Sequence, residues 1–316
     1  MTGWVATKSV PAGWSELCAK HDCLFHSQSW MELLERSFGC QSIYVSNDGL
    51  SLGAGISVFR AGPFKLGYLG FPVGGFVGGG GIGGSELVHF QRALVGQGPV
   101  AIRIPASAFG RSETLDLCYA ATSETAIVDL QSWSLSSASE NRRRDVKKSL
   151  RSGLDLMDAT DPSDGTRLYD LYRKTIVRNR GSLRYTASYF EELIRLANAQ
   201  SNIRVLLARM GDSIVAFNVG ARHGLSSFYL HGAFDWDMRA YRPSALLMNE
   251  AIKWAKEDGC HSFNLMSSPP GQVSLIRFKE HWGAETREHR TYTLPMSWTY
   301  GAFRMAEWLY RQAHRS

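Results

Sequence analysis

The chain has 316 residues, of which 44% are apolar and 20% are charged, and its formal net charge at pH 7 is +6. This composition supports two compact units with packed cores and excludes a wholly disordered chain, while the mild positive charge is far below that of a protein that coats nucleic acid. The sequence shows no run of 18 apolar residues and no secretory signal, so we expect a cytoplasmic protein without a membrane-spanning helix.

The first half of the chain alternates helical and strand patterns. A capping box at Ser29 opens a helix with Trp30 and Phe38 on its apolar face. Asp48-Gly49 marks a hairpin turn between two strands. The remaining predicted elements are a strand around Tyr68, a glycine-rich loop over 71–84, a helix over 86–95 and a strand over 100–105.

The second half has a clearer pattern. Helices are predicted to begin at Asp161 and at Ser188. Three strands over 203–209, 213–222 and 226–234 are separated by short turns, which predicts an antiparallel meander. The last predicted elements are a helix from Pro243 to Gly259, a strand over 261–266, a helix over 273–283, a strand over 289–294 and an amphipathic helix in the tail.

The two halves loosely repeat one order of elements, so we predict an α/β fold with a mixed sheet in two duplicated units. The first unit covers residues 1–150, the second covers 151–295, and the C-terminal amphipathic helix covers 296–316. The five cysteines contain no Cys-x-x-Cys pair, which argues against a metal site.

Four short motifs follow one another along the chain. They are Phe25-x-Ser27-x-x-Trp30, the basic stretch from Arg142 to Gly153, Arg239-x-x-Arg242-Pro243-Ser244, and Phe278-Lys279-x-x-Trp282-Gly283. In this order, over roughly residues 20–295, the chain resembles the Fem-type and BioF2-like (peptidoglycan aminoacyltransferase-like) group of the GNAT acyltransferase superfamily. The resemblance implies a tandem GNAT fold, with the acyl donor bound by the second unit and the acceptor in a groove between the units. Members move an acyl or aminoacyl group onto an amine, often of a cell-envelope precursor.

The third motif supplies the predicted donor-binding residues Arg239, Arg242 and Ser244. Relatives that use acetyl-CoA read Arg/Gln-x-x-Gly-x-Gly/Ala here, and the glycines let backbone N–H groups close around the pyrophosphate. In this chain Arg242 and Ser244 replace the small residues, and Pro243 has no N–H to donate. The departure leaves aminoacyl-tRNA and acyl-carrier-protein donors open beside acyl-CoA. The alternative is a plain proline-initiated helix with surface arginines.

Lys279 is the first catalytic candidate. Attack of an amine on an ester or thioester creates an oxyanion, and a nearby cation stabilises it. The matching Phe-Lys pair of Fem-type enzymes lies at the donor end, so the resemblance places Phe278 against the donor. The alternative is a core Phe278 beside a solvated Lys279. His231 is the second catalytic candidate, as the base that takes the ammonium proton, against a hydrogen-bonded strand histidine.

Two further groups of basic residues have candidate ligands. Relatives carry an acceptor-facing arginine near Arg178 and Arg184, so these two and the neighbouring Tyr185 are the predicted acceptor contacts, against exposed loop arginines. The stretch 141–151 carries six basic residues and one Asp. It suits a tRNA acceptor arm, a nucleotide diphosphate or an anionic membrane, against a solvated helix face.

The glycine-rich loop and the tail have weaker signals. The loop has eight glycines in fourteen positions without a following acidic residue at the spacing of a dinucleotide site. A flap over the acceptor is one interpretation, and a disordered connector is the simpler one. The basic, aromatic tail predicts either interfacial membrane contact or packing against the protein.

We therefore predict an N-acyltransferase that moves an acyl or aminoacyl group from an activated ester or thioester to a primary amine, in the assembly of cell-envelope or surface-polysaccharide precursors. It needs no metal and no tightly bound cofactor, because the donor (aminoacyl-tRNA, acyl-carrier protein or acyl-CoA) is a co-substrate. Expected partners are the amine acceptor and a tRNA or carrier-protein donor, with peripheral contact at the inner membrane face and no DNA. The alternatives are a CoA-dependent N-acetyltransferase of a soluble amine or amino acid, and a non-catalytic RNA- or membrane-associated binding module.

Overall fold

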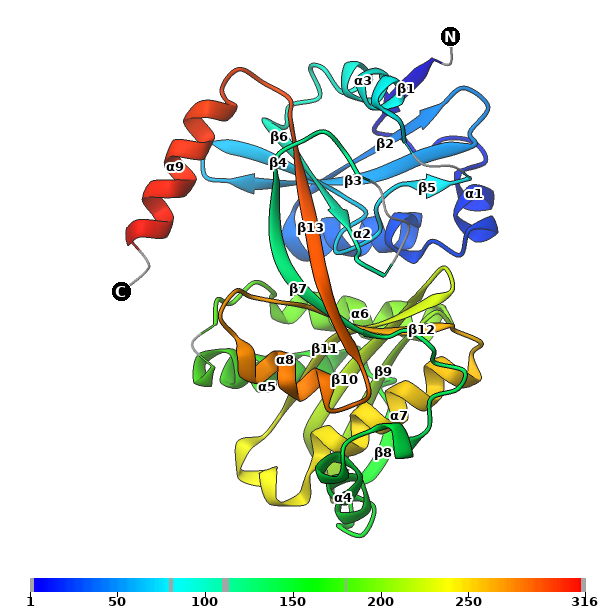
Figure 1. The fold of residues 1–316 in the computed structure, drawn as a ribbon, viewed down its shortest axis with the longest axis vertical. Coiled ribbons are helices and arrows are strands. Elements are labelled where there is room, and N and C mark those ends of the chain that lie inside the picture. The colour runs from blue at the N-terminus through cyan, green and yellow to red at the C-terminus, as the bar shows by residue number, and fades with distance from the viewer. Residues whose placement is uncertain (1–2, 80–81, 110–113, 180, 314–316) are drawn as a thin grey trace. The chain divides into compact units, whose positions relative to one another are not determined.

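The computed structural model describes residues 3–79, 82–109, 114–179 and 181–313. The chain divides into two compact units. Figure 1 colours the chain from blue at the N-terminus to red at the C-terminus. Unit 1 comprises Met1–Glu35, Gly39–Ala121 and His289–Ser316, and unit 2 comprises Arg36–Phe38 and Thr122–Glu288.

This division differs from the predicted boundary near residue 150. Strands β7 (Tyr119–Ile127) and β13 (Glu285–Pro295) each begin in one unit and end in the other. Helix α4 (Glu140–Ser149), predicted for the first unit, contributes Val146 to the core of unit 2. The C-terminal helix α9 (Tyr300–Ala313) belongs to unit 1. Each unit is therefore completed by chain from beyond the predicted boundary.

Unit 1 is built on a mostly antiparallel sheet. Its strands lie in the order β1 (Trp4–Thr7), β2 (Gln41–Asn47), β3 (Leu52–Ala61), β4 (Phe64–Leu69), β6 (Ala101–Ala106) and the C-terminal part of β13, and the short β5 (Val77–Gly78) pairs with β3. Its helices are α1 (Trp14–Lys20), α2 (Gln28–Phe38, whose last residues join unit 2) and α3 (Gly84–Ala93), with a 3-10 turn η1 (Leu24–His26). Strands β4 and β6 are parallel, and α3 lies between them in the chain, as a parallel connection requires.

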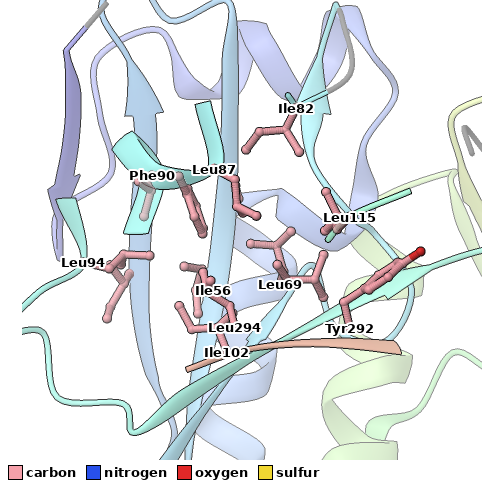
Figure 2. Close-up of a cluster of buried hydrophobic side chains, with 14 of the residues drawn as sticks. Ile56, Leu69, Ile82, Leu87, Phe90, Leu94, Ile102, Leu115, Tyr292 and Leu294 are labelled. Atoms are coloured by element: carbon pink, nitrogen blue, oxygen red, sulfur yellow. The ribbon is translucent and has the colours of Figure 1, made fainter. Parts of the chain in front are cut away.

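The core of unit 1 lies between this sheet and α3, as Figure 2 shows. Alternate residues of each strand face the cluster, because side chains on a strand point to opposite faces in turn. Its labelled members are Ile56, Leu69, Ile82, Leu87, Phe90, Leu94, Ile102, Leu115, Tyr292 and Leu294. Each large side chain removed from water in this way contributes about 1.5–3 kcal/mol, so the cluster is the main stabiliser of unit 1.

Unit 2 has its own mixed sheet. Its strands lie in the order β7, β12 (Ser262–Ser268), β11 (Ser226–Phe234), β10 (Ser213–His223), β9 (Ile203–Met210) and β8 (Asp155–Asp158). Its other elements are α5 (Gly165–Arg178), α6 (Ala187–Ala199), α7 (Pro243–Glu257), α8 (Val273–Glu280) and the 3-10 turns η2 (Leu135–Ser137), η3 (Pro162–Asp164) and η4 (Trp236–Tyr241). The antiparallel meander β9–β10–β11 is confirmed.

Helices cover both faces of the unit 2 sheet. Phe217 of β10 packs on Phe190 of α6, with ring centroids 5.6 Å apart. The next residue, Asn218, donates to the Leu247 carbonyl of α7 at 3.2 Å. Neighbouring residues of a strand point to opposite faces, so α6 and α7 lie on opposite sides of the sheet.

The described part of the glycine-rich loop is packed, so the prediction of a disordered connector is wrong there. His26 is fully buried against Gly70 and Gly74, and a Cβ atom at either glycine would come within 2.8 Å of its ring. Burial lowers the pKa of His26 to about 4. Residues 80 and 81 of the loop lie outside the described residues.

Candidate functional site

Strands β11 and β12 run parallel but pair only briefly. Ser226–Phe228 pair with Ser262–Asn264. Further along, β11 continues to Phe234 on β10, and β12 continues to Ser268 on β7. Neighbouring parallel strands that separate in this way leave facing backbone N–H and C=O groups outside the ladder, where an extended ligand can use them.

Both strands are irregular just beyond this point. The register of β11 on β10 skips Leu230, which is a β-bulge, and β12 shifts its register on β7 between Asn264 and Ser267. Met266 within that shift has φ 66°, a left-handed conformation that costs a non-glycine residue about 1–2 kcal/mol. Bulges re-aim side chains and end pairing, so the two strands are shaped for something other than a regular sheet.

Lys279 of α8 reaches the end of β12. Its ammonium donates to Met266 O at 2.8 Å, to Ser267 O at 3.3 Å and to Ser268 Oγ at 2.8 Å. The residue is only 7% exposed, so it is not the solvated lysine of the alternative interpretation. Burial lowers the pKa of Lys279 to about 8, and the nearby Glu124 carboxylate opposes this shift. The structure therefore fixes a buried cation beside the bulge of β12.

A buried carboxylate and amide complete this group. Asn264 Nδ2 donates to Glu124 Oε1 at 2.7 Å, and Met266 N donates to Asn264 Oδ1 at 2.7 Å. Glu124 is 1% exposed and Asn264 2%. The polar atoms of β7, β12 and α8 are thus joined in one network, which stabilises the bulge around Met266.

His231 follows the bulge of β11 and lies among aromatic rings. Its Nε2 is 3.0 Å from Tyr189 OH, and the rings of Tyr185 and Phe190 have centroids 4.5 Å and 5.6 Å away. Burial lowers the pKa of His231 to about 3, so the imidazole is neutral at pH 7 and is a weak base. The geometry is that of a hydrogen-bonded strand histidine in an aromatic wall.

The predicted acceptor residues separate into two places. Tyr185 stacks on Tyr189 at 4.6 Å beside His231, and burial raises the pKa of Tyr185 to about 12. Arg184 is exposed, and its backbone N–H donates to Tyr172 OH at 3.1 Å. The structure thus brings Tyr185 and His231 together with Arg184 adjacent, whereas Arg178 lies elsewhere.

The ring of Trp236 in η4 contacts two arginines for which different ligands are predicted from the sequence. The guanidinium carbon of Arg178 is 4.5 Å from its ring centroid, and that of Arg239 is 5.2 Å away. Arg239 also donates to Trp236 O at 3.0 Å. Since Trp236 is 49% exposed, this is a surface cation–π cluster in which a predicted acceptor contact and a predicted donor contact share one ring.

Arg242 precedes the first turn of α7 in a left-handed conformation, with φ 58° and ψ 42°. A glycine would adopt this conformation freely, and the resemblance implies glycine here in the relatives that use acetyl-CoA. The Arg242 side chain is 3.0 Å from Asp145 of α4, and Asp145 also pairs with Arg142 at 3.1 Å. Ser244 is half-buried in the first turn of α7. The ion pairs therefore join α4 to the N-terminus of α7.

Phe278 occupies the same region from α8. Its ring packs against the hydrophobic core of unit 2, and the Arg142 guanidinium lies 5.4 Å from its centroid. Phe278 is half-buried, which leaves part of the ring accessible beside the arginine.

A surface groove of about 630 Å³ lies along α4. Three basic residues of α4 and one from the turn after it line the groove together with η4. The lining is Arg144, Lys147, Lys148, Arg151, Ser152, Ala240 and Tyr241. Arg144 is 3.9 Å from Glu140, but among the described residues no acidic side chain pairs with the other three cations. The groove is therefore strongly positive.

Several residues of these groups were missed by sequence reasoning. In the sequence, Glu124 and Asn264 look like the solvent-facing polar residues of ordinary strands, although both are buried. Asp145 looks like a single acidic residue within a basic stretch. Only Trp236 had a local signal, since it lies two residues after the end of the predicted strand and shortly before Arg239 and Arg242. The described residues contain no group of three His, Cys, Asp or Glu side chains placed to hold a metal.

Comparison with protein families found one match. Residues 136–279 match the family described as Acetyltransferase (GNAT) domain. A search of curated proteins found no match.

Solved structures with a similar fold are numerous. FemX superposes with a TM-score of 0.67 at 14% identity, over 95% of this chain and 99% of that one. The C-terminal domain of a putative lysylphosphatidylglycerol synthetase from Agrobacterium fabrum gives 0.58 at 15% identity, over 95% and 97%. A tandem GNAT protein from the clavulanic acid biosynthesis pathway gives 0.50 at 10% identity, over 94% and 99%. At these identities the likeness shows the fold alone.

Proposed function

The chain carries a GNAT acetyltransferase domain within a tandem GNAT fold and is an acyltransferase, and from this premise we propose that it transfers an acyl or aminoacyl group to a primary amine in cell-envelope or surface-polysaccharide assembly. The observation that carries the proposal is the separation of β11 and β12 beside a buried cation. Both features lie in unit 2, which contains the matched domain.

The donor is proposed to bind along the separated strands. Its extended arm takes backbone hydrogen bonds along β11 beyond Phe228, where the ladder with β12 has ended. On β12 the backbone groups of Met266 already bond Asn264 and Lys279. The amine nitrogen attacks the donor carbonyl, the carbon–oxygen or carbon–sulfur bond breaks, and the leaving group departs with a proton from the ammonium. Negative charge builds up on the carbonyl oxygen during this step.

Lys279 is the proposed electrostatic stabiliser of that charge. Its three N–H groups already have acceptors in the chain, so it acts on the developing charge mainly through its positive electrostatic field. Its longest hydrogen bond, to Ser267 O, can also be replaced by one to the carbonyl oxygen of the donor. Glu124 keeps Lys279 protonated by opposing the effect of burial. His231 is proposed as a polar wall residue that contacts the acceptor, since a pKa of about 3 makes it a poor proton acceptor.

The donor is proposed to be polyanionic. Arg239 and Arg242 both lie just before the start of α7, and the groove along α4 adds four cations. Phosphates of an aminoacyl-tRNA suit such a surface, and Tyr241, which is 40% exposed in the groove, offers a ring for base stacking. Phe278 beside Arg142 is the proposed contact for the terminal part of the donor.

The acceptor assignment follows the relatives. A lysylphosphatidylglycerol synthetase domain and FemX share the fold, and the sequence resembles the Fem-type group. We therefore propose an amino sugar or a stem peptide as the acceptor, held by Arg184 and Tyr185, with Arg178 on the Trp236 cluster as a second anion contact.

Label transfer tests the proposal. The chain is mixed with a panel of amine acceptors and, in separate reactions, with bulk tRNA charged with radiolabelled amino acids, acyl-carrier protein or acetyl-CoA. We expect transfer from charged tRNA and a loss of about 100-fold in Lys279→Met, with the rate falling above pH 8 as Lys279 loses its proton. Lys253→Met is the matched control, because Lys253 is exposed and pairs with Glu250 on α7. Equal rates in wild type and Lys279→Met would remove the site.

A CoA-dependent N-acetyltransferase is the second candidate, favoured by the description of the matched family. It predicts thermal stabilisation by acetyl-CoA and none by charged tRNA. Arg242 and Ser244 stand where relatives that use acetyl-CoA have small residues, and Pro243 between them has no N–H to donate. The first candidate therefore predicts the reverse order.

A further inference from the structure

Helix α9 of unit 1 leaves large apolar side chains in water. Met305 is 60% exposed, Trp308 55% and Leu309 55%, and Trp298 in the segment before the helix is 93% exposed. Met305, Trp308 and Leu309 are spaced three and four apart, so they form one stripe along the helix. We call these four residues the apolar stripe.

The stripe is held outward by contacts on another side of α9. Phe303 is 5% exposed and packs on Phe64 of β4, with ring centroids 5.5 Å apart. Glu307 pairs with Arg103 of β6 at 3.4 Å. These two anchors fix the rotation of the helix about its axis, so the exposure of the stripe is a property of the folded unit.

Positive charge flanks the stripe. Arg304 is exposed one helical turn before Trp308. The acidic Glu307 is neutralised by Arg103. The surface of α9 therefore combines exposed apolar side chains with an exposed arginine.

We propose that the apolar stripe of α9 docks unit 1 on the surface of an anionic phospholipid bilayer. Tryptophan suits the bilayer interface because its ring is apolar while its N–H remains hydrated, and methionine and leucine insert beside it. Arg304, exposed one turn before Trp308, complements the anionic headgroups. The helix lies on the membrane and does not cross it, since no described helix is long and apolar enough to span one. This inference is independent of the proposed reaction.

Vesicle flotation of the full chain tests the inference. We expect binding to vesicles of phosphatidylglycerol and phosphatidylcholine in equal parts, and weak binding to phosphatidylcholine alone. Trp308→Gln with Leu309→Gln should reduce the partition coefficient roughly tenfold or more. Arg304→Gln should reduce it about fivefold at low salt. Leu225→Gln is the matched control, because Leu225 is a 65% exposed leucine in the β10–β11 turn of unit 2.

Three results would overturn the inference. One is binding of the double variant to anionic vesicles as tightly as the wild type. Another is equal loss in Leu225→Gln, which would show a nonspecific effect. The third is that the wild type does not bind vesicles but forms a concentration-dependent dimer in sedimentation, and that the double variant does not form this dimer. The stripe would then be an interface between copies of the chain. Circular dichroism melts check that the exposed substitutions leave the fold intact.

Discussion

At the scale of single residues, Lys279 and Glu124 are two buried ionisable side chains of unit 2 that influence each other. Lys279 donates to Ser268 on β12, and Glu124 accepts from Asn264 on the same strand. Burying a charge without partners costs several kcal/mol, so these bonds are what allow the charges to remain. The Phe-Lys motif in the sequence identified Lys279. Glu124 and the hydrogen-bond partners of Lys279 could be identified only from the tertiary structure.

Stability should depend on pH through Lys279. Its folded pKa of about 8 lies below the ordinary 10.5, so the unfolded state binds this proton more tightly. Between pH 8 and 10.5 the free energy of unfolding should therefore rise with pH, by up to about 1.4 kcal/mol per unit, and below pH 8 this slope disappears. Urea denaturation of wild type and Lys279→Met at pH 7.5, 9 and 10 measures it. The variant should lack the slope and Lys253→Met should keep it; parallel curves for all three chains would contradict a buried ammonium.

Arg242 tests the left-handed position before α7. Arg242→Gly removes a half-exposed ion pair with Asp145, worth at most about 1 kcal/mol, but relieves a backbone strain of about 1–2 kcal/mol. Arg242→Ala loses the pair and keeps the strain. We expect the glycine variant to be more stable than the alanine variant by roughly 1 kcal/mol or more in chemical denaturation. The reverse order would show that residue 242 is not left-handed in solution.

At the scale of elements, the sheets depart from regular geometry where the candidate site lies. Alternation in the sequence predicted the strands β9, β10 and β11 with nearly the observed bounds. It did not predict the bulges at Leu230 and Met266, because a bulge changes register by one residue without changing composition. These bulges place His231 and the acceptors of Lys279.

The glycine-rich loop offers a second test at this scale. A Cβ at Gly74 would lie 2.8 Å from His26 Nε2 and 2.9 Å from the Gly70 backbone, whereas one at Gly84 meets nothing within 4 Å. Gly74→Ala should therefore lower the free energy of unfolding by about 1–3 kcal/mol. Gly84→Ala, at the start of α3, should raise it by up to about 1 kcal/mol. Thermal melts distinguish the two; equal effects would mean that the loop is not packed on His26.

At the scale of the whole molecule, the two units recruit strands from outside their own half of the sequence. Strand β7 and helix α4 supply Ile127 and Val146 to the core of unit 2, together with Leu130 and Trp133 between them. The predicted boundary near residue 150 assigns all four residues to the first unit, although they belong to the core of unit 2.

Fragments compare the two boundaries. A fragment of residues 122–288 keeps the complete core of unit 2, so we expect a cooperative thermal transition and resistance to limited proteolysis. A fragment of residues 151–295 loses four large buried side chains and should be unfolded or aggregated, since each contributes about 1.5–3 kcal/mol. Cooperative folding of the second fragment alone would restore the boundary predicted from the sequence.

The sequence by itself determined the class of fold, most helices and strands, and the motifs that resemble GNAT acyltransferases, because periodicity, caps and short motifs are local. Strands β1, β7 and β8 and helix α1 were not predicted, since their residues carry weak local patterns. The strands are held by pairing with other strands of the sheet, and α1 is held by packing of its side chains on Tyr44 and Val77. Only the tertiary structure decided that Lys279 is buried, that Arg178 and Arg239 share Trp236, and that Glu124 joins the network. Burial and proximity depend on which segments the sheet brings together, and no local pattern encodes that.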